Sequence, residues 1–224
     1  MPYIGYDIDL FMEDIRELIA RVDLEGIRRL LSRHRELANA GIALGSQDAS
    51  PAHPLHRICD GVHRGVYSDE QARDMAQVFV DLGADVNGVE LVENRDSPLT
   101  AAASLFADLT GMYYIDQGAS ISHPGCHGGT ALHWAAWCGR DLLVKKLIDA
   151  GAPLEQRCKD FRSTPLFWAI HGYVFEGGKN RYHQVECAQL LIRAGANKDT
   201  RNAEGWHIRE LLDANDSTLQ SLLS

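Results

Sequence analysis

The fold is decided by residues 129–139, which read Gly-Thr-Ala-Leu-His-Trp-Ala-Ala-Trp-Cys-Gly. The hydroxyl of Thr130 can accept a hydrogen bond from a backbone N–H and so begin a helix, and the small residues at 135–136 allow another helix to pack closely. A second signal follows at 150–152, where Ala-Gly-Ala ends an apolar stretch. Glycine at such a position is typical of a helix end, because it adopts the left-handed backbone conformation without strain.

Both signals recur along the 224-residue chain. Copies of the opening signal begin at 53, 97 and 164, with a degraded copy at 205, and the closing Gly-Ala recurs at 83–84, 118–119 and 195–196. From Gly-Ala to the next opening signal the chain advances 14, 12 and 13 residues, and the openings at 97 and 130 are 33 residues apart. A near-constant period of this length indicates stacked repeats that bury their apolar faces against one another.

Each unit is predicted to contain two helices. The first begins at the opening signal, where Ser97 and Thr164 are each followed by Pro at the first helical position, which needs no N–H. The second has apolar residues at the spacing of one helix face, as at 75, 78, 79 and 82. Asn and Asp residues between the closing glycine and the next opening signal favour turns.

The opening signal, the 33-residue period and the closing Gly-Ala-Asp-Val-Asn at 83–87 resemble the ankyrin repeat. The resemblance implies one all-α ankyrin-repeat solenoid, a stack of helix-turn-helix units joined by hairpin-like loops. We expect a degenerate first repeat at 1–45, repeats at 48–88, 92–124, 125–157 and 159–201, and a C-terminal cap at 202–224.

Two units are longer than the others, by about nine and ten residues between the opening signal and Gly-Ala. We expect these insertions, at 62–70 and 172–183, to form loops between the first and second helices. Loops on a rigid scaffold often carry recognition, and loops also tolerate neutral change, so both interpretations stay open. The side chains in question are His63, Arg64, Tyr67, Tyr173, Phe175, Lys179, Arg181, Tyr182 and His183.

The resemblance implies that the chain binds another protein through the concave face and the hairpin tips. Carried over by position, the candidate contact residues are Glu93, Asp96, His127, Trp137, Cys138, Asp160, Phe161 and His171. The rings among them would form an aromatic patch beside acidic tips. Trp137 and Phe161 either anchor a partner or pack between repeats, whereas Trp134 and Trp168 are expected to pack.

The net charge of −9 is carried by residues 1–108, which hold 19 acidic and 10 basic side chains, because residues 109–224 hold 12 of each. Such a surface disfavours nucleic acids and anionic membranes, and it either suits a basic partner or serves solubility. Five cysteines without a C-x-x-C pair, no apolar run of membrane-spanning length and no basic-apolar leader favour a cytoplasmic protein with free thiols, and we expect it to be a monomer.

Chemical motifs are sparse. His123, Cys126 and His127 lie close in sequence, but their spacing fits no known zinc finger, and the resemblance gives His133 a structural role, a hydrogen bond to the backbone of the next repeat. No nucleophile, zinc-protease or phosphate-loop signature occurs. We therefore expect no catalytic residue, metal or cofactor, and an interaction module as the function. The alternatives are an inhibitor or immunity protein that masks a basic enzyme or toxin, and a metal-binding or catalytic protein.

Overall fold

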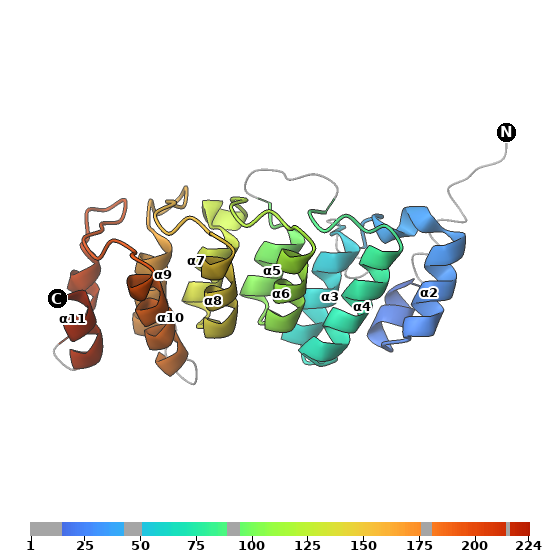
Figure 1. Ribbon diagram of the computed structural model, residues 1–224, viewed down its shortest axis with the longest axis horizontal. Coiled ribbons are helices and arrows are strands. Elements are labelled where there is room, and N and C mark those ends of the chain that lie inside the picture. Colours follow the sequence, from blue (N-terminus) through green and yellow to red (C-terminus); the bar gives the residue numbers. More distant parts are fainter. Residues whose placement is uncertain (1–14, 43–50, 89–94, 176–180, 214–215) are drawn as a thin grey trace.

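A computed structural model describes residues 15–42, 51–88, 95–175, 181–213 and 216–224, and these form one elongated stack of helices (Figure 1). Residues 15–20 are helical. The α-helices that follow are α2 (Leu24–Arg33), α3 (Pro54–His63), α4 (Asp69–Asp81), α5 (Pro98–Ser104), α6 (Asp108–Asp116), α7 (Ala131–Trp137), α8 (Asp141–Asp149), α9 (Pro165–Phe175), α10 (Arg181–Arg193) and α11 (Ser217–Leu223). Short 3₁₀ helices are η1 (Arg35–Ala38), η2 (Cys126–Gly128) and η3 (Ile208–Leu211).

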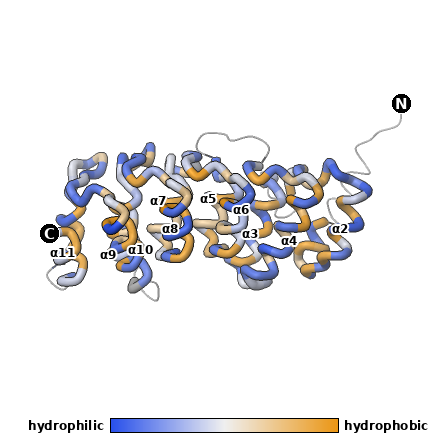
Figure 2. Tube along the Cα trace, viewed as in Figure 1, coloured by the Kyte–Doolittle hydropathy of each residue, from blue (hydrophilic) through white to orange (hydrophobic). Residues whose placement is uncertain are grey.

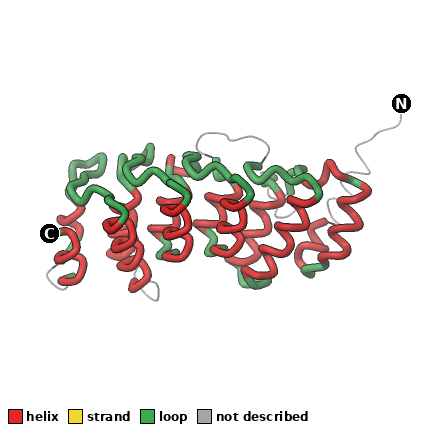
Figure 3. Tube along the Cα trace, in the orientation of Figure 1, coloured by secondary structure: helices red, strands yellow, loops and turns green. Residues whose placement is uncertain are grey.

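The helices form two layers. The first helices of the units, α3, α5, α7 and α9, each pack on the next, and the second helices α4, α6, α8 and α10 do the same, with α2 against α4. The long loops gather along one edge of the array (Figure 3). Within the described residues, extended pairing is limited to the isolated bridges Ile42–Ala52 and Arg201–His207, so the all-α prediction is confirmed.

The opening and closing signals act as predicted. Ser97 caps α5 by accepting a hydrogen bond from the Thr100 N–H at 3.2 Å, and Thr130 forms a capping box with His133 at the start of α7. The four closing glycines, at 83, 118, 151 and 195, all have φ between 84° and 102°. They occupy equivalent corners that a residue with a Cβ would strain, which explains why the signal recurs.

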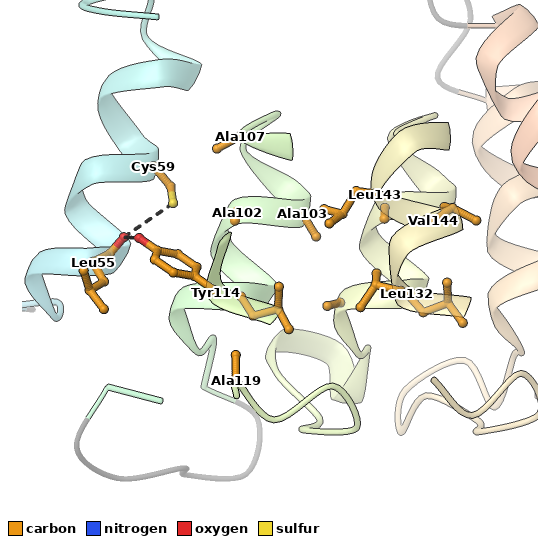
Figure 4. Packing of buried hydrophobic residues seen from close by; sticks show 14 of the residues in the cluster. Leu55, Cys59, Ala102, Ala103, Ala107, Tyr114, Ala119, Leu132, Leu143 and Val144 are labelled. Carbon is orange, nitrogen blue, oxygen red and sulfur yellow. Dashed lines mark hydrogen bonds between the residues drawn. The ribbon is translucent and has the colours of Figure 1, made fainter. Parts of the chain in front are cut away.

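The core runs continuously between the units. Tyr114 of α6 is fully buried and donates its hydroxyl to the Leu55 carbonyl of α3 at 2.8 Å, which ties two units together (Figure 4). Small buried residues, such as Ala102 and Ala135, let the first helices approach one another. Apolar stretches recur in the helices, while hydrophilic residues are frequent in the loops (Figure 2). No unit could bury these faces alone, so the stack folds by sharing them.

The expected inter-helix loops are the point where the sequence prediction was wrong. Most of the extra residues lengthen helices: α3 and α4 have 10 and 13 residues, whereas α5 and α6 have 7 and 9. Tyr67, expected on a recognition loop, is buried and donates its hydroxyl to the Ile58 carbonyl at 2.9 Å. Likewise α9 extends to Phe175 and α10 begins at Arg181, while 176–180 lie outside the described residues.

No helix within the described ranges combines the length and the apolar character that a membrane crossing needs.

Candidate protein-binding surface

Helices α7 and α9, together with the loop tips beside them, enclose a hollow of about 430 Å³. Its floor and walls are mostly rings: His127, Trp134, Trp137, Phe161, Trp168 and His171. The hollow lies between consecutive units, so no single repeat could form it.

The repeat register explains why the rings meet. Trp134 and Trp137 lie four and seven residues after the N-cap Thr130. Trp168 and His171 lie four and seven residues after Thr164, the equivalent position in the next unit. Residues three apart lie on the same face of a helix. Because α7 and α9 pack side by side, these two pairs come into contact.

Trp168 forms the floor. It is only 4% exposed, and its ring meets Trp134 and Trp137 edge-on, with centroid distances of 5.1 and 5.7 Å. Its indole Nε1 donates to the Cys158 sulfur at 3.4 Å. The buried thiol therefore fixes the orientation of the ring that supports the other aromatic side chains.

The helix-side wall is a stack of flat rings. Trp137 lies 4.7 Å from His171 with a 25° angle between the ring planes, and His171 lies 4.2 Å from Phe175 at the end of α9. Burial lowers the pKa of His171 below its usual value, so this ring is neutral at pH 7. Phe175 is 62% exposed, which leaves the end of the stack open to a partner.

The tip-side wall is formed by His127 and Phe161, whose ring centroids are 5.5 Å apart. His127 Nδ1 lies 2.8 Å from a carboxylate oxygen of Asp160, and the His127 carbonyl accepts hydrogen bonds from the N–H groups of Lys159 and Asp160. These bonds join one loop tip to the next. Phe161 is nevertheless 48% exposed, and so presents a large apolar surface on an ordered loop.

The last side of the hollow belongs to the final unit. Asn202 and Glu204 line it, and the N–H of Ala203 donates to the Phe161 carbonyl at 2.7 Å, which holds this tip against the previous one. Glu204 is exposed at the rim and forms no ion pair with any residue in the described part of the chain.

Two buried polar atoms in the walls are unsatisfied. Trp134 Nε1 and His171 Nδ1 have no hydrogen-bond partner among the residues that the structure describes. Buried polar groups are nearly always paired in folded proteins, and an unpaired one lowers stability by about 1–3 kcal/mol. The ring cluster is thus less favourable than an ordinary core would be, as expected of a surface kept for binding.

Of the residues predicted from the sequence, His127, Trp137, Phe161 and His171 meet in the hollow, and Asp160 adjoins it through His127. Asp96 lies elsewhere: its carboxylate accepts from the Cys126 N–H at 3.0 Å.

Two further candidates do not contribute to the hollow as described. Cys138 is half-buried, with its sulfur 3.8 Å from the Ser104 carbonyl of the preceding unit. Glu93 lies outside the described residues.

Sequence reasoning missed the contributions of Cys158, Asn202 and Glu204, and it treated Trp134 and Trp168 as packing residues only. Both tryptophans do pack, and both also line the hollow. The repeat period could have indicated these contributions, because each loop tip lies against the tip of the next unit.

The histidines near the possible metal cluster have other roles. His123 is buried, with its Nε2 2.7 Å from the Arg95 carbonyl, and His133 Nε2 lies 3.1 Å from the Ser163 carbonyl, as the inter-repeat role of His133 predicted. No group of three metal-binding side chains occurs in the part of the chain that the structure describes.

A stack of paired helices with a ring-lined hollow between two units belongs to the class of helical-repeat binding scaffolds. The Ankyrin repeat family model matches residues 127–159 and 162–203, which form most of the hollow. Residues 127–203 of the chain thus match ankyrin repeats, and ankyrin repeats are protein-interaction modules.

Three relatives show how far the similarity extends. Mouse palmitoyltransferase ZDHHC13 is 26% identical over 166 residues, 74% of this chain and 24% of the relative. Human palmitoyltransferase ZDHHC13 is 33% identical over 92 residues, and palmitoyltransferase Hip14 of Drosophila melanogaster is 29% identical over 91. Each of these two matches covers 41% of this chain and 13% of the relative. The chain thus spans about a quarter or less of the length of these relatives.

Proposed function

We propose that the chain binds a segment of a partner protein in the aromatic hollow between α7, α9 and the loop tips. The observation that supports this most directly is the set of rings on three sides of an open hollow of about 430 Å³. Large aromatic side chains that are held rigid and partly exposed are typical binding hot spots. The loop tips are joined by hydrogen bonds before any partner arrives, so association would order few protein groups.

The partner is proposed to be basic. No lysine or arginine lines the hollow among the described residues, whereas Glu204 does, and residues 1–108 add a net charge of −9 to the chain. Inhibition of a basic enzyme or toxin is the second candidate function, supported by the same charge. The discriminating result is strong binding to such an enzyme that weakens steeply as salt is added, with loss of the enzyme's activity.

We assign no transferase activity to this chain. The similarity to palmitoyltransferases covers a quarter or less of those proteins, and the family match within this chain is to ankyrin repeats. We further propose that the protein is a monomer, and that it acts in the cytoplasm, a reducing compartment that suits its five free cysteines.

Selection from a displayed random-peptide library tests the proposed function. The chain is immobilised in three forms: wild type, Trp137→Ala, and Leu142→Ala as a control. Leu142 is 59% exposed on α8, in the other helix layer, so its removal also deletes a large exposed apolar group. We expect enriched peptides to bind wild type and Leu142→Ala equally, and Trp137→Ala about thirtyfold more weakly, a loss of about 2 kcal/mol.

Folding of the variant must be checked at the same time. We expect the thermal unfolding midpoint of Trp137→Ala to remain within a few degrees of wild type. A large fall in that midpoint would place Trp137 in the core, and peptides that ignore the substitution would contradict the proposed function.

A further inference from the structure

The hollow has a marked imbalance of charge. Among the described residues that line it, Glu204 is the only side chain of fixed charge, and the other titratable groups are His127 and His171. His171 is neutral at pH 7, because burial lowers its pKa. Two arginines of the last tips bind backbone carbonyls: Arg157 donates to Arg201 O at 2.8 Å, and Arg201 donates to Gly205 O at 2.7 Å. A cation from a partner would therefore meet no fixed positive charge in the lining.

The rings also select among cations. Trp137 stacks on His171 with 25° between the ring planes, Phe175 lies against His171 at a tilt of 34°, and a planar guanidinium group can add to such a row of rings. Indole faces attract cations, and a guanidinium holds its water less tightly than an ammonium does. The walls offer few hydrogen-bond acceptors to replace the water that a lysine ammonium would lose. Ring chemistry therefore favours arginine over lysine.

Glu204 is positioned to pair with such a group. Its tip is held by the bond from Ala203 N–H to the Phe161 carbonyl, and Asn202 accepts hydrogen bonds from the N–H groups of Glu204 and Trp206 at 3.1 and 2.9 Å. A carboxylate can accept both parallel N–H bonds of a guanidinium. The rings of the hollow could therefore stack on the plane of an arginine guanidinium group, and Glu204 at the rim could pair with its charge.

We infer that the hollow binds the guanidinium group of an arginine in the partner segment, stacked on the rings and paired with Glu204. This inference rests on the proposed function, since it names the side chain by which the partner would be recognised. The arginine stem would pack along Trp137 and Phe161, and its charge would point toward the rim.

Four capped pentapeptides of the form Gly-Gly-X-Gly-Gly, with X as arginine, citrulline, trimethyllysine or norleucine, test the inference against the full chain. Citrulline is the closest control, because it keeps the shape of arginine and loses the charge. Binding is followed through the indole N–H signals of the ¹⁵N-labelled protein, assigned by single Trp→Phe changes. We expect the arginine peptide to shift the Trp137 and Trp168 signals saturably, with a Kd about tenfold or more below that of citrulline.

A matched pair of variants tests the role of the carboxylate. Glu204→Gln is expected to weaken the arginine peptide by about three- to tenfold, whereas Glu186→Gln, an equal change on α10, is expected to alter the Kd by less than about twofold. Equal binding of arginine and citrulline, tighter binding of norleucine or trimethyllysine, or no binding by any peptide would overturn the inference. Signals that move with protein concentration alone would overturn it too, because a second copy would then fill the hollow.

These outcomes are separate from those of the library selection. Library peptides that require Trp137 but contain no arginine would leave the proposed function standing and refute only the arginine inference.

Discussion

The two ends of the array place different chemistry on equivalent positions. Four and seven residues after the N-cap, α7 presents Trp134 and Trp137, whereas α3 presents Arg57 and Asp60. In α3 the two side chains satisfy each other, because Arg57 Nη1 lies 2.9 Å from an Asp60 carboxylate oxygen and its Nε donates to the Ile42 carbonyl at 2.7 Å. In α7 the Trp134 N–H has no partner in the described residues.

The hollows follow from that difference. Arg57 and Asp60 line a hollow of about 210 Å³ at the N-terminal end, roughly half the volume of the aromatic one. Arg16 and Arg64 line it as well, so a partner cation would meet positive charge there. The backbone sets where a hollow can form, and two side chains per unit set its size and its charge.

The largest expected effect is at the floor of the aromatic hollow. Trp168→Ala should lower the free energy of unfolding by about 3–5 kcal/mol, because it removes a buried ring that four other rings contact. Arg57→Ala, at the equivalent place in α3, should lose about 1–3 kcal/mol. Urea unfolding measures both losses. Equal losses would mean that the aromatic end is not specially dependent on its rings.

Acid should lower the folding stability of both ends of the array. Burial lowers the pKa of His133 and of His53 from 6.5 to about 4 in the folded chain. The unfolded chain therefore takes up protons between pH 6.5 and 4 that the folded chain cannot, so stability is complete above pH 6.5 and falls as the pH drops to 4. Each histidine could contribute about 3 kcal/mol at most.

Urea midpoints at pH 7.5, 6 and 5 measure this decline. In His133→Gln the stability should depend less on pH, because glutamine does not titrate. An unchanged pH dependence would show that His133 is not a source of the acid sensitivity.

Close backbone approach differs between the ends. Gly172 of α9 faces the Trp137 carbonyl, which also accepts from Gln184 Nε2 at 2.6 Å, and an added methyl would collide with that carbonyl. Gly172→Ala should therefore cost about 1–3 kcal/mol and disturb the Trp137–His171 stack. Gly111→Ala in α6 would meet the Leu143 methyls at 3.2 Å and the Ala102 Cβ at 3.3 Å, which are looser contacts, and should cost less. Thermal unfolding of the two variants tests the order, which would be reversed if α7 and α9 could separate freely.

The smallest effect concerns a turn. Phe106 lies nine residues after the N-cap Ser97 and has a φ of 64°. Gly139 lies nine residues after the next N-cap, Thr130, and has a φ of 67°. The Phe106 ring stacks on His63 at 5.7 Å and lies 5.2 Å from the Arg140 guanidinium carbon, contacts that hold it in this backbone conformation. Phe106→Gly should therefore be more stable than Phe106→Ala by about 1 kcal/mol, since both lose the ring and only alanine keeps the strain. Denaturant midpoints that rank alanine above glycine would contradict this.

The sequence predicts the fold well because the repeating signals are local. A hydroxyl at the N-cap and a glycine at the left-handed corner act within a few residues, and all four predicted corners are found. The prediction that the extra residues of the long units form loops was wrong because helix length depends on packing. Tyr67, for example, is buried between the helices, and no turn signal in the sequence indicates this.

The site was predicted only in part, for a related reason. The rings of α7 can be assigned to one face from their spacing, but the contact of Cys158 with Trp168 and the place of Glu204 in the lining depend on how neighbouring loop tips pack. Sequence spacing within a unit does not show how far one tip overlaps the next. It also cannot show that Trp168 is both a core residue and the floor of an open surface.

The stack of Trp137 on His171 crosses from one repeat to the next, and this has an evolutionary consequence. Duplication of one whole unit between α8 and α9 would carry these rings apart and abolish recognition, although every helix and cap stayed intact. The same duplication between α4 and α5 would spare them. Gain or loss of a partner can thus come from the order of modules, with no change in any side chain of the surface.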